Sequence, residues 1–278
     1  MWFDNYFLTF VRSIILRRRL RSGSPLPEWF QRDIIRASRR LGRPIPTNQI
    51  DLLGYNIYFM GEFQFRVLFK EIYIDGSYFF QASDDRPLIF DCGSNIGMSV
   101  LFFKKLYPNA RIVAFEPDPF TFEILRRNVD QNHLSDIALH QIALSNRVGD
   151  IELFRDTSPD SASLVMSTLR QRHNVRSVIV PSQPLSKFIS GKVDLVKLDV
   201  EGAEEAVMND LIGADKLRLV RRLHLEYHHH IDKSVDSLSR MLRLLEENGF
   251  GYQLRAHTLA PWPSEASFQD ISIYAYRN

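Results

Sequence analysis

Cysteine is almost absent from this chain. Cys92 is the single cysteine among 278 residues, so no disulfide can form within the chain. A reducing compartment is compatible with this, and we expect a cytoplasmic protein. The sequence also lacks an internal repeat, a P-loop, a CxxC pair, zinc-ligand spacing and a G-x-S-x-G elbow. None of the chemistries that depend on those motifs is therefore predicted.

Long apolar runs are missing too. The most apolar stretch, residues 2–20, is interrupted by Asp4 and Arg12 and is too short to span a bilayer. It lacks the basic start and the cleavage site of a secretory signal. Its aromatic and aliphatic residues could share a helix face ahead of several arginines, which is typical of a helix on an anionic membrane. Peripheral membrane contact through residues 1–21 is one expectation, and a helix packed on the domain or on another subunit is the alternative.

Charge is nearly balanced over the whole chain but not along it. The net charge of +2 gives no strong nucleic-acid signal, and we expect no nucleic-acid partner. Residues 1–43 nevertheless hold ten arginines and three acids, whereas the rest holds 25 basic and 30 acidic residues. We therefore divide the chain into a basic, helical N-terminal extension, residues 1–50, and one α/β domain, residues 51–278. No oligomeric state is predicted.

The most informative stretch begins at residue 88. Residues 88–90 are a short apolar run that predicts a buried strand, and residues 91–97 form a glycine-bearing turn. Residues 98–107 have apolar side chains at helical spacing, and residues 112–115 predict a second strand that ends in Glu116. A strand, a glycine turn, a helix, a strand and an acid in this order indicate a nucleotide-binding βαβ unit.

The spacing within this unit favours one class of nucleotide. Its turn has the form D-x-G-x-x-x-G, from Asp91 through Gly93 to Gly97, and the dinucleotide fingerprint G-x-G-x-x-G is absent. Glu116 follows Gly97 by 19 residues, where a carboxylate can accept hydrogen bonds from ribose hydroxyls. Cationic S-adenosylmethionine (SAM) fits better than NAD, and a Rossmann-like core with an ordinary glycine turn is the alternative. The predicted cofactor-binding residues, within a core of about 86–145, are Asp91, Gly93, Ser94, Asn95, Gly97, Glu116, Pro117, Asp118 and Ala143.

A second stretch, residues 193–204, carries charges at a predicted strand end. Lys197, Asp199 and Glu201 alternate with apolar neighbours, so they should point to one side. Ligands of doubly wound sheets lie at the carboxyl ends of strands, and three charges there would be costly to bury without a role or partners. A functional site is therefore predicted. The structural alternative is a pair of acids at a helix N-terminus with a lysine counter-ion.

The next predicted strand, residues 223–227, ends near two more candidates. Glu226 and His228 could reach the same pocket as Asp199. A carboxylate-histidine group could act as a general base or bind a divalent metal. The alternative is that three histidines in a loop are partly exposed and have no catalytic role, which is the more frequent case. The predicted catalytic residues, on active-site strands of about 193–230, are Lys197, Asp199, Glu201, Glu226 and His228, and a metal would use Asp199, Glu226 and His228.

Other segments carry simpler expectations. Residues 50–60 have strand character, and residues 137–144 predict one strand. The polar segment 158–174 is expected to form an active-site loop or lid. Residues 252–256 and 267–276 predict an antiparallel hairpin at the edge of the sheet.

These patterns together resemble the FkbM family of SAM-dependent methyltransferases. The resemblance covers about residues 78–252, and its motifs occur in the family's order. They are residues 91–97, 115–118, 143–145 and, the most specific, 194–204. Cys92 and Ser94 stand where the family usually has Val or Ile and Ala, a small departure that should leave binding intact.

The resemblance implies a class I methyltransferase fold, which is Rossmann-like with a mostly parallel, doubly wound sheet. It implies methyl transfer from SAM, usually to a hydroxyl of a sugar, polyketide or similar metabolite, so the expected partner is a small-molecule or glycan acceptor. We expect Glu116 to hold the ribose, Asp91 to lie near the methionine moiety, and a predicted catalytic residue to supply a base or a metal ligand. Two other functions stay open: an NAD-dependent oxidoreductase, and a non-catalytic protein that binds SAM or a partner through its basic N-terminal segment.

Overall fold

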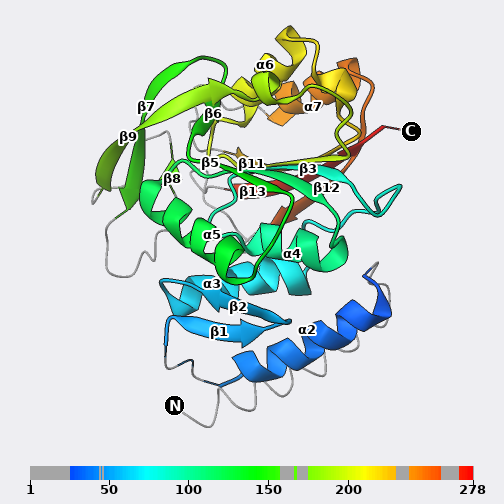
Figure 1. Ribbon diagram of the computed structural model, residues 1–278. Helices are drawn as coiled ribbons and strands as arrows, with labels where there is room; N and C mark the ends of the chain where they lie inside the picture. The colour runs from blue at the N-terminus through cyan, green and yellow to red at the C-terminus, as the bar shows by residue number, and fades with distance from the viewer. Residues whose placement is uncertain are drawn as a thin grey trace.

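A seven-stranded sheet forms the centre of the protein (Figure 1). The structure is a computed structural model, and it describes residues 26–43, 45, 47–156, 166–167, 175–229, 238–257 and 269–277. In spatial order the strands are β5 (Ile137–His140), β4 (Arg111–Phe115), β3 (Leu88–Cys92), β10 (Leu195–Leu198), β11 (Arg222–His229), β13 (Gln269–Tyr276) and β12 (Gly251–His257). The first five are parallel, and β13 is antiparallel to both β11 and β12. The mostly parallel sheet with an antiparallel edge hairpin is therefore confirmed.

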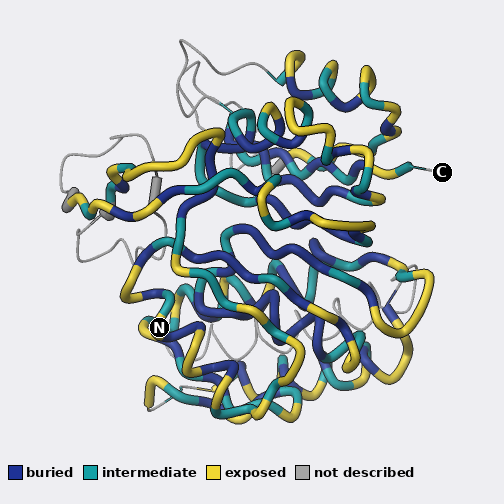
Figure 2. Tube along the Cα trace, turned by 45° about the horizontal axis from the view of Figure 1, so that its top comes forward, coloured by how far each residue is buried: buried dark blue, intermediate teal, exposed yellow. Residues whose placement is uncertain are grey.

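Helices cover both faces of this sheet, which confirms the doubly wound arrangement. α4 (Met98–Leu106) and α5 (Pro119–Gln131) lie on one face, and α6 (Glu204–Gly213) and α7 (Leu238–Glu247) lie on the other (Figure 1). Because each central strand is covered on both sides, its residues are buried in succession, and the strands run as buried segments through the middle of Figure 2. The order of strands reverses between β3 and β10, which makes their carboxyl ends the expected position of a ligand.

The N-terminal part packs as a further layer beneath α4 and α5. It contains α2 (Glu28–Leu41), the hairpin of β1 (Gln49–Leu52) and β2 (Tyr55–Tyr58), α3 (Glu62–Phe69) and the π-helical turn η1 (Lys70–Ile74). Phe30 of α2 contacts Phe102 of α4 with ring centroids 5.5 Å apart, and both belong to one buried core. α2 is therefore part of the domain's core packing, and the expected boundary between residues 50 and 51 falls inside β1.

Two predicted strands are divided in the structure. Residues 50–60 form a hairpin because Leu53 and Gly54 both have positive φ and reverse the chain. The prediction of a single strand over residues 137–144 is wrong, because the chain leaves the main sheet after His140. The carbonyl of His140 accepts a hydrogen bond from the backbone amide of Glu116 at the end of the β4–β5 pairing.

The segment that leaves the main sheet begins a second one. β6 (Ala143–Ser145) pairs with β9 (Val175–Pro184), which also pairs with β7 (Gly149–Asp156), and β8 (Met166–Ser167) completes this four-stranded sheet. It extends to one side of the central sheet (Figure 1) and brings residues of β6 and β7 to the carboxyl ends of the parallel strands.

Several expectations concern residues that the structure does not describe. The membrane contact through residues 1–21 lies outside the described residues, as does the predicted loop 158–174 apart from Met166 and Ser167. Among the described helices, none is both long and apolar enough to cross a membrane.

Candidate functional site

A pocket opens at the carboxyl ends of β3, β4 and β10, where the strand order reverses. The space between its walls and out through its open mouth is about 610 Å³. Its lining includes five predicted cofactor-binding residues and two predicted catalytic residues: Gly93, Asn95, Glu116, Pro117, Ala143, Asp199 and Glu201. Members of both predicted groups therefore share one cavity, whereas Lys197, Glu226 and His228 are not part of its lining.

Glu116 is held in place by the backbone of the glycine turn. One carboxylate oxygen accepts from the amide of Asn95 at 2.9 Å and the other from the amide of Asp118 at 3.0 Å. The side chain is 7% exposed, and burial raises its pKa to about 7 although these two amides lower it. The remaining lone pairs of this fixed carboxylate are available on the pocket side, where it can accept hydrogen bonds from hydroxyl donors.

The other predicted cofactor-binding residues lie behind the pocket lining and fix the backbone of the segments that form it. The Ser94 hydroxyl donates to the carbonyl of Asp91 at 2.8 Å, and the Asp118 carboxylate caps α5 by accepting from the amide of Thr121 at 3.1 Å. Gly97 has φ +90° and precedes α4 as its N-cap. Asp91 itself is fully buried, so its carboxylate does not line the pocket.

Gly93 allows two strand ends to approach closely. It has φ +81°, and a Cβ atom there would lie 1.8 Å from the carbonyl oxygen of Asp199. The amide of Asp199 in turn donates to the carbonyl of Cys92 at 3.1 Å, so the two segments are fixed side by side. The glycine is therefore required by the neighbouring strand.

Gly93→Ala is expected to lower the free energy of unfolding by about 2–5 kcal/mol, because positive φ and the collision with a backbone atom both cost energy. Gly76→Ala is the matched control, since Gly76 has φ +68° but no atom within 4 Å of its added Cβ. That variant should lose only about 1 kcal/mol. Urea unfolding monitored by circular dichroism measures both, and equal losses would contradict the close-approach argument.

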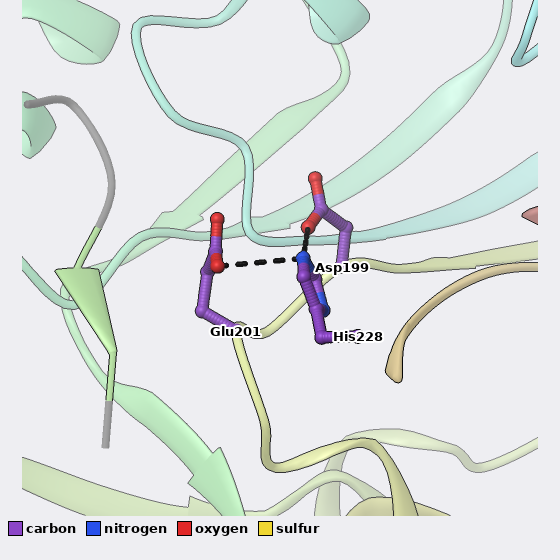
Figure 3. A group of neighbouring side chains, drawn as sticks. All are labelled: Asp199, Glu201 and His228. Atoms are coloured by element: carbon purple, nitrogen blue, oxygen red, sulfur yellow. Dashed lines mark ion pairs between the residues drawn. The ribbon is translucent and has the colours of Figure 1, made fainter. Parts of the chain in front are cut away.

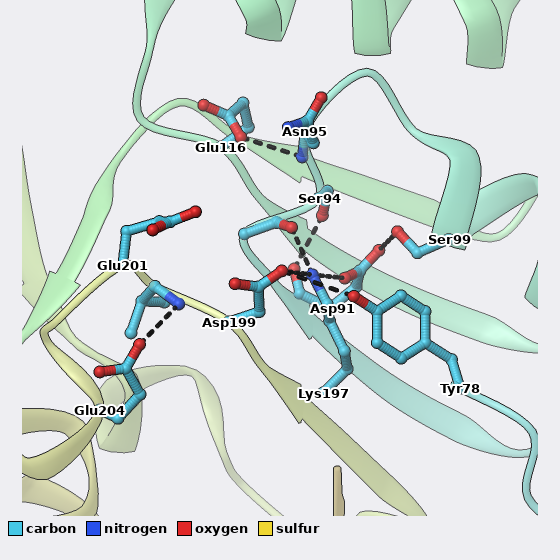
Figure 4. A network of polar contacts seen from close by, with 12 residues as sticks. Tyr78, Asp91, Ser94, Asn95, Ser99, Glu116, Lys197, Asp199, Glu201 and Glu204 are labelled. Carbon is cyan, nitrogen blue, oxygen red and sulfur yellow. Dashed lines mark hydrogen bonds and ion pairs between the residues drawn. The ribbon is translucent and has the colours of Figure 1, made fainter. Parts of the chain in front are cut away.

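A buried lysine lies between two carboxylates under the pocket (Figure 4). The Lys197 ammonium is 3.1 Å from Asp199 Oδ2 and 3.6 Å from Asp91 Oδ1, and it donates to the carbonyl of Gly93 at 2.5 Å. Burial alone lowers the pKa of Lys197, but Asp199 and Asp91 outweigh it and raise that pKa, so the side chain stays charged. Ser99 donates to the other oxygen of Asp91 at 2.6 Å. Lys197 is 2% exposed and is not part of the pocket lining, and its ammonium group fixes the position of the Asp199 carboxylate.

His228 lies beside the pocket within a group of acids (Figure 3). Its Nδ1 is 2.9 Å from the carboxylate of Glu204, which fixes the ring and directs Nε2 toward the pocket acids. Nε2 is 3.3 Å from Glu201 Oε2 and 3.8 Å from Asp199 Oδ1. Glu204 is oriented by the amide of Gly202, which donates to it at 3.1 Å. Burial raises the pKa of Glu201 to about 8, although His228 lowers it.

The expected metal set is distributed over two neighbouring groups. In one, ligand atoms of Asp199, Glu201 and His228 lie within 4.8 Å of one another, and in the other those of Glu226, His228 and Asp270 do. His228 belongs to both, whereas Asp199 and Glu226 fall in different groups. Burial and the charge of Asp199 raise the pKa of Glu226 well above its usual range.

Sequence reasoning missed several residues around this site. Glu204 lies within the motif of residues 194–204 without a predicted role, and Asp270 arrives on the antiparallel strand β13. The Tyr78 hydroxyl is 3.5 Å from Asp199 Oδ2, 121 residues further along the chain. Burial, and then the charge of Asp199, raise the pKa of Glu71 in η1 to about 7. Spacing patterns carry no signal for contacts between segments so far apart.

Comparison with known proteins gives consistent matches. The family model of the methyltransferase FkbM domain matches residues 91–252. The chain is 32% identical over 212 residues to Methyltransferase 1 of Beauveria bassiana, covering 69% of this chain and 83% of that protein. It is 29% identical to the 31-O-demethyl-FK506 methyltransferase FkbM of Streptomyces tacrolimicus, covering 68% of this chain and 82% of that one. It is also 29% identical to the 2-O-methyltransferase NoeI of Sinorhizobium fredii, with coverages of 51% and 63%.

Proposed function

The chain belongs to the FkbM family of SAM-dependent methyltransferases, and on that premise we propose that it transfers the methyl group of SAM to a hydroxyl oxygen of a sugar, glycan, polyketide or similar metabolite. The fold is the class I methyltransferase fold, and SAM is the methyl donor. One observation carries the proposal for the site: Glu116 and Asp199 line the same pocket, so a donor-holding acid and a potential base face one cavity.

The donor is proposed to bind with its ribose against Glu116. The carboxylate is fixed through the amides of Asn95 and Asp118, and two ribose hydroxyls would donate to its free lone pairs. Ala143 and Leu144 line the pocket beyond Glu116 and suit the adenine ring. The methionine end would then extend past Gly93 toward Asp199.

Asp199 is proposed as the base. In an in-line displacement, the acceptor oxygen attacks the methyl carbon, the carbon–sulfur bond breaks, and the demethylated product keeps the electron pair on sulfur. The hydroxyl proton passes to the Asp199 carboxylate. Lys197 and Tyr78 fix one oxygen of Asp199, and His228 lies beside the other. Holding donor and acceptor in line in this way can contribute up to about 7–11 kcal/mol.

A divalent cation at the same group is a second candidate, favoured by the carboxylates gathered around His228 Nε2. Oxygen ligands with one imidazole suit Mg²⁺ or Mn²⁺, and Asp199, Glu201 and His228 would hold the ion. Such an ion would lower the pKa of the acceptor hydroxyl. Dialysis against a chelator tests this: activity that is lost and then restored by Mg²⁺ or Mn²⁺ supports the ion, whereas unchanged activity leaves Asp199 as the base.

The acceptor class is tested by incubating the protein with methyl-labelled SAM and a panel of hydroxylated compounds. Relatives named as a 31-O- and a 2-O-methyltransferase support oxygen acceptors, one of them on the FK506 scaffold. Label in an ether-linked methyl group of a sugar or polyketide is the expected product. Label that enters only amines or thiols would contradict the proposed acceptor.

Affinity for SAM is expected to rise with pH through neutrality. Burial raises the pKa of Glu116 to about 7, and the neighbouring charges of Asp118 and Lys197 shift it in opposite directions. Ribose hydroxyls donate to the ionised form, whose fraction increases from about one tenth to about nine tenths between pH 6 and pH 8. The association constant should therefore rise about tenfold over that range. Glu116→Gln should bind weakly with a flat profile, and an equal slope in that variant would assign the effect to another group.

A further inference from the structure

We propose that the exposed face of α2 binds the surface of an anionic phospholipid bilayer. This interaction surface, which we call the arginine face, consists of Trp29, Arg32, Arg36, Arg39, Arg40 and Arg43. Of the helices and strands that the structure describes, α2 lies outermost on its side, opposite α6 and α7 (Figure 1). The proposal does not depend on the methyl-transfer chemistry.

The residues of the arginine face follow one side of the helix. With 3.6 residues per turn, they fall within an arc of about 100° and extend over about 21 Å of helix axis, Arg43 just past its end. The opposite side is buried through Phe30, Ile34, Ala37 and Leu41, which belong to the protein core. The helix is thus fixed in rotation, and the arginine face is held toward solvent.

The positive charge of this face is only partly balanced. Arg32 lies 3.7 Å from Glu28, and Arg36 lies 3.4 Å from Asp33. Asp33 is also 3.4 Å from Lys105, so its charge is shared with a second cation. Among the described residues, Arg39, Arg40 and Arg43 have no ion pair. Both acids of the helix, Glu28 and Asp33, lie just outside the arc and toward its N-terminal end, so the C-terminal part of the face carries positive charge alone.

The composition of the face fits lipid headgroups. Every basic residue before Lys70 is an arginine, and guanidinium groups bind phosphate oxygens through two parallel hydrogen bonds. Trp29 is 41% exposed on the same face, and tryptophan is enriched where one end of a side chain is apolar and the other wet. Duplex nucleic acid would also attract the arginines, but it gives no reason for an exposed tryptophan beside them.

The test is co-sedimentation of the full chain with vesicles of phosphatidylcholine alone or mixed with phosphatidylserine. Binding is expected only with the anionic lipid and should weaken as salt increases. Combined Arg36→Gln, Arg39→Gln and Arg43→Gln should reduce the partition coefficient on the order of tenfold to 100-fold. The control, Arg111→Gln, Arg147→Gln and Arg221→Gln, removes three exposed arginines from elsewhere and should change it less than about twofold.

Two further measurements distinguish binding through α2 from a fold defect and from binding through another surface. Replacement of the same three α2 arginines by lysine keeps the charge and should keep most of the binding, which guards against a fold defect. In a Trp2→Phe, Trp262→Phe chain, Trp29 is the only tryptophan, and its emission should shift to the blue on anionic vesicles. Equal loss in the α2 and control variants, no vesicle binding, or preferential binding of duplex DNA would overturn the proposal.

Discussion

Asp199→Asn is expected to lower kcat for methyl transfer by about 100- to 10,000-fold, the usual contribution of a positioned base. The substitution keeps the shape of the side chain and an oxygen for Lys197, but it removes the charge that would take the acceptor proton. Binding of SAM should change much less, because the proposed ribose acceptor is Glu116, another residue of the pocket lining. Initial rates with the acceptor found in the screen, at saturating SAM, measure the effect.

Asp215→Asn is the matched control for this variant. Asp215 is 75% exposed and pairs on the surface with Arg218, so its substitution should leave kcat unchanged. Full turnover in both Asp199→Asn and His228→Ala would show that the catalytic group has been assigned to the wrong residues. Loss in Asp199→Asn with normal turnover in His228→Ala would leave Asp199 as the base and restrict His228 to support.

Glu116→Ala is expected to weaken SAM binding by at least about 100-fold. Hydrogen bonds to a charged group contribute about 1.5–3 kcal/mol each, and the variant removes the acceptor of two such bonds. It also leaves the amides of Asn95 and Asp118 without their partner, which loosens the glycine turn. Isothermal titration calorimetry gives the dissociation constant directly.

Glu123→Ala provides the comparison for Glu116→Ala. Glu123 lies on α5, seven residues after Glu116, and pairs with Arg126 on the surface. Its loss should leave SAM affinity within about twofold, because exposed pairs of this kind contribute little. If Glu116→Ala bound SAM as tightly as the unchanged chain, the ribose role of Glu116 would be ruled out.

Local patterns were sufficient to bring the glycine turn and Glu116 to one pocket, which is the proposed donor site. β3, the glycine turn, α4, β4 and Glu116 are consecutive, and in a right-handed βαβ unit their order alone brings Glu116 beside the turn. That is why the expected residues Gly93, Asn95, Glu116 and Pro117 all line the pocket. The paired strand ends β10 and β11 could be placed by the same rule.

Contacts between distant segments could not be predicted in this way. Asp91 was expected near the methionine moiety, but its carboxylate is turned toward Ser99 and Lys197 in the interior. A register pair between β3 and β10 decides this, with Asp91 opposite Lys197, and register follows from packing of the whole sheet. The contact of Tyr78 with Asp199 also depends on packing between distant segments, because Tyr78 belongs to the buried core that the N-terminal layer forms with α4.

Titration calorimetry of the purified chain with SAM, with its demethylated product and with NAD tests the central claim most directly. SAM and the demethylated product should each bind with one molecule per chain, and NAD should not bind. A folded protein that bound NAD, or that bound neither SAM nor its product with or without a divalent cation, would contradict the donor site at Glu116.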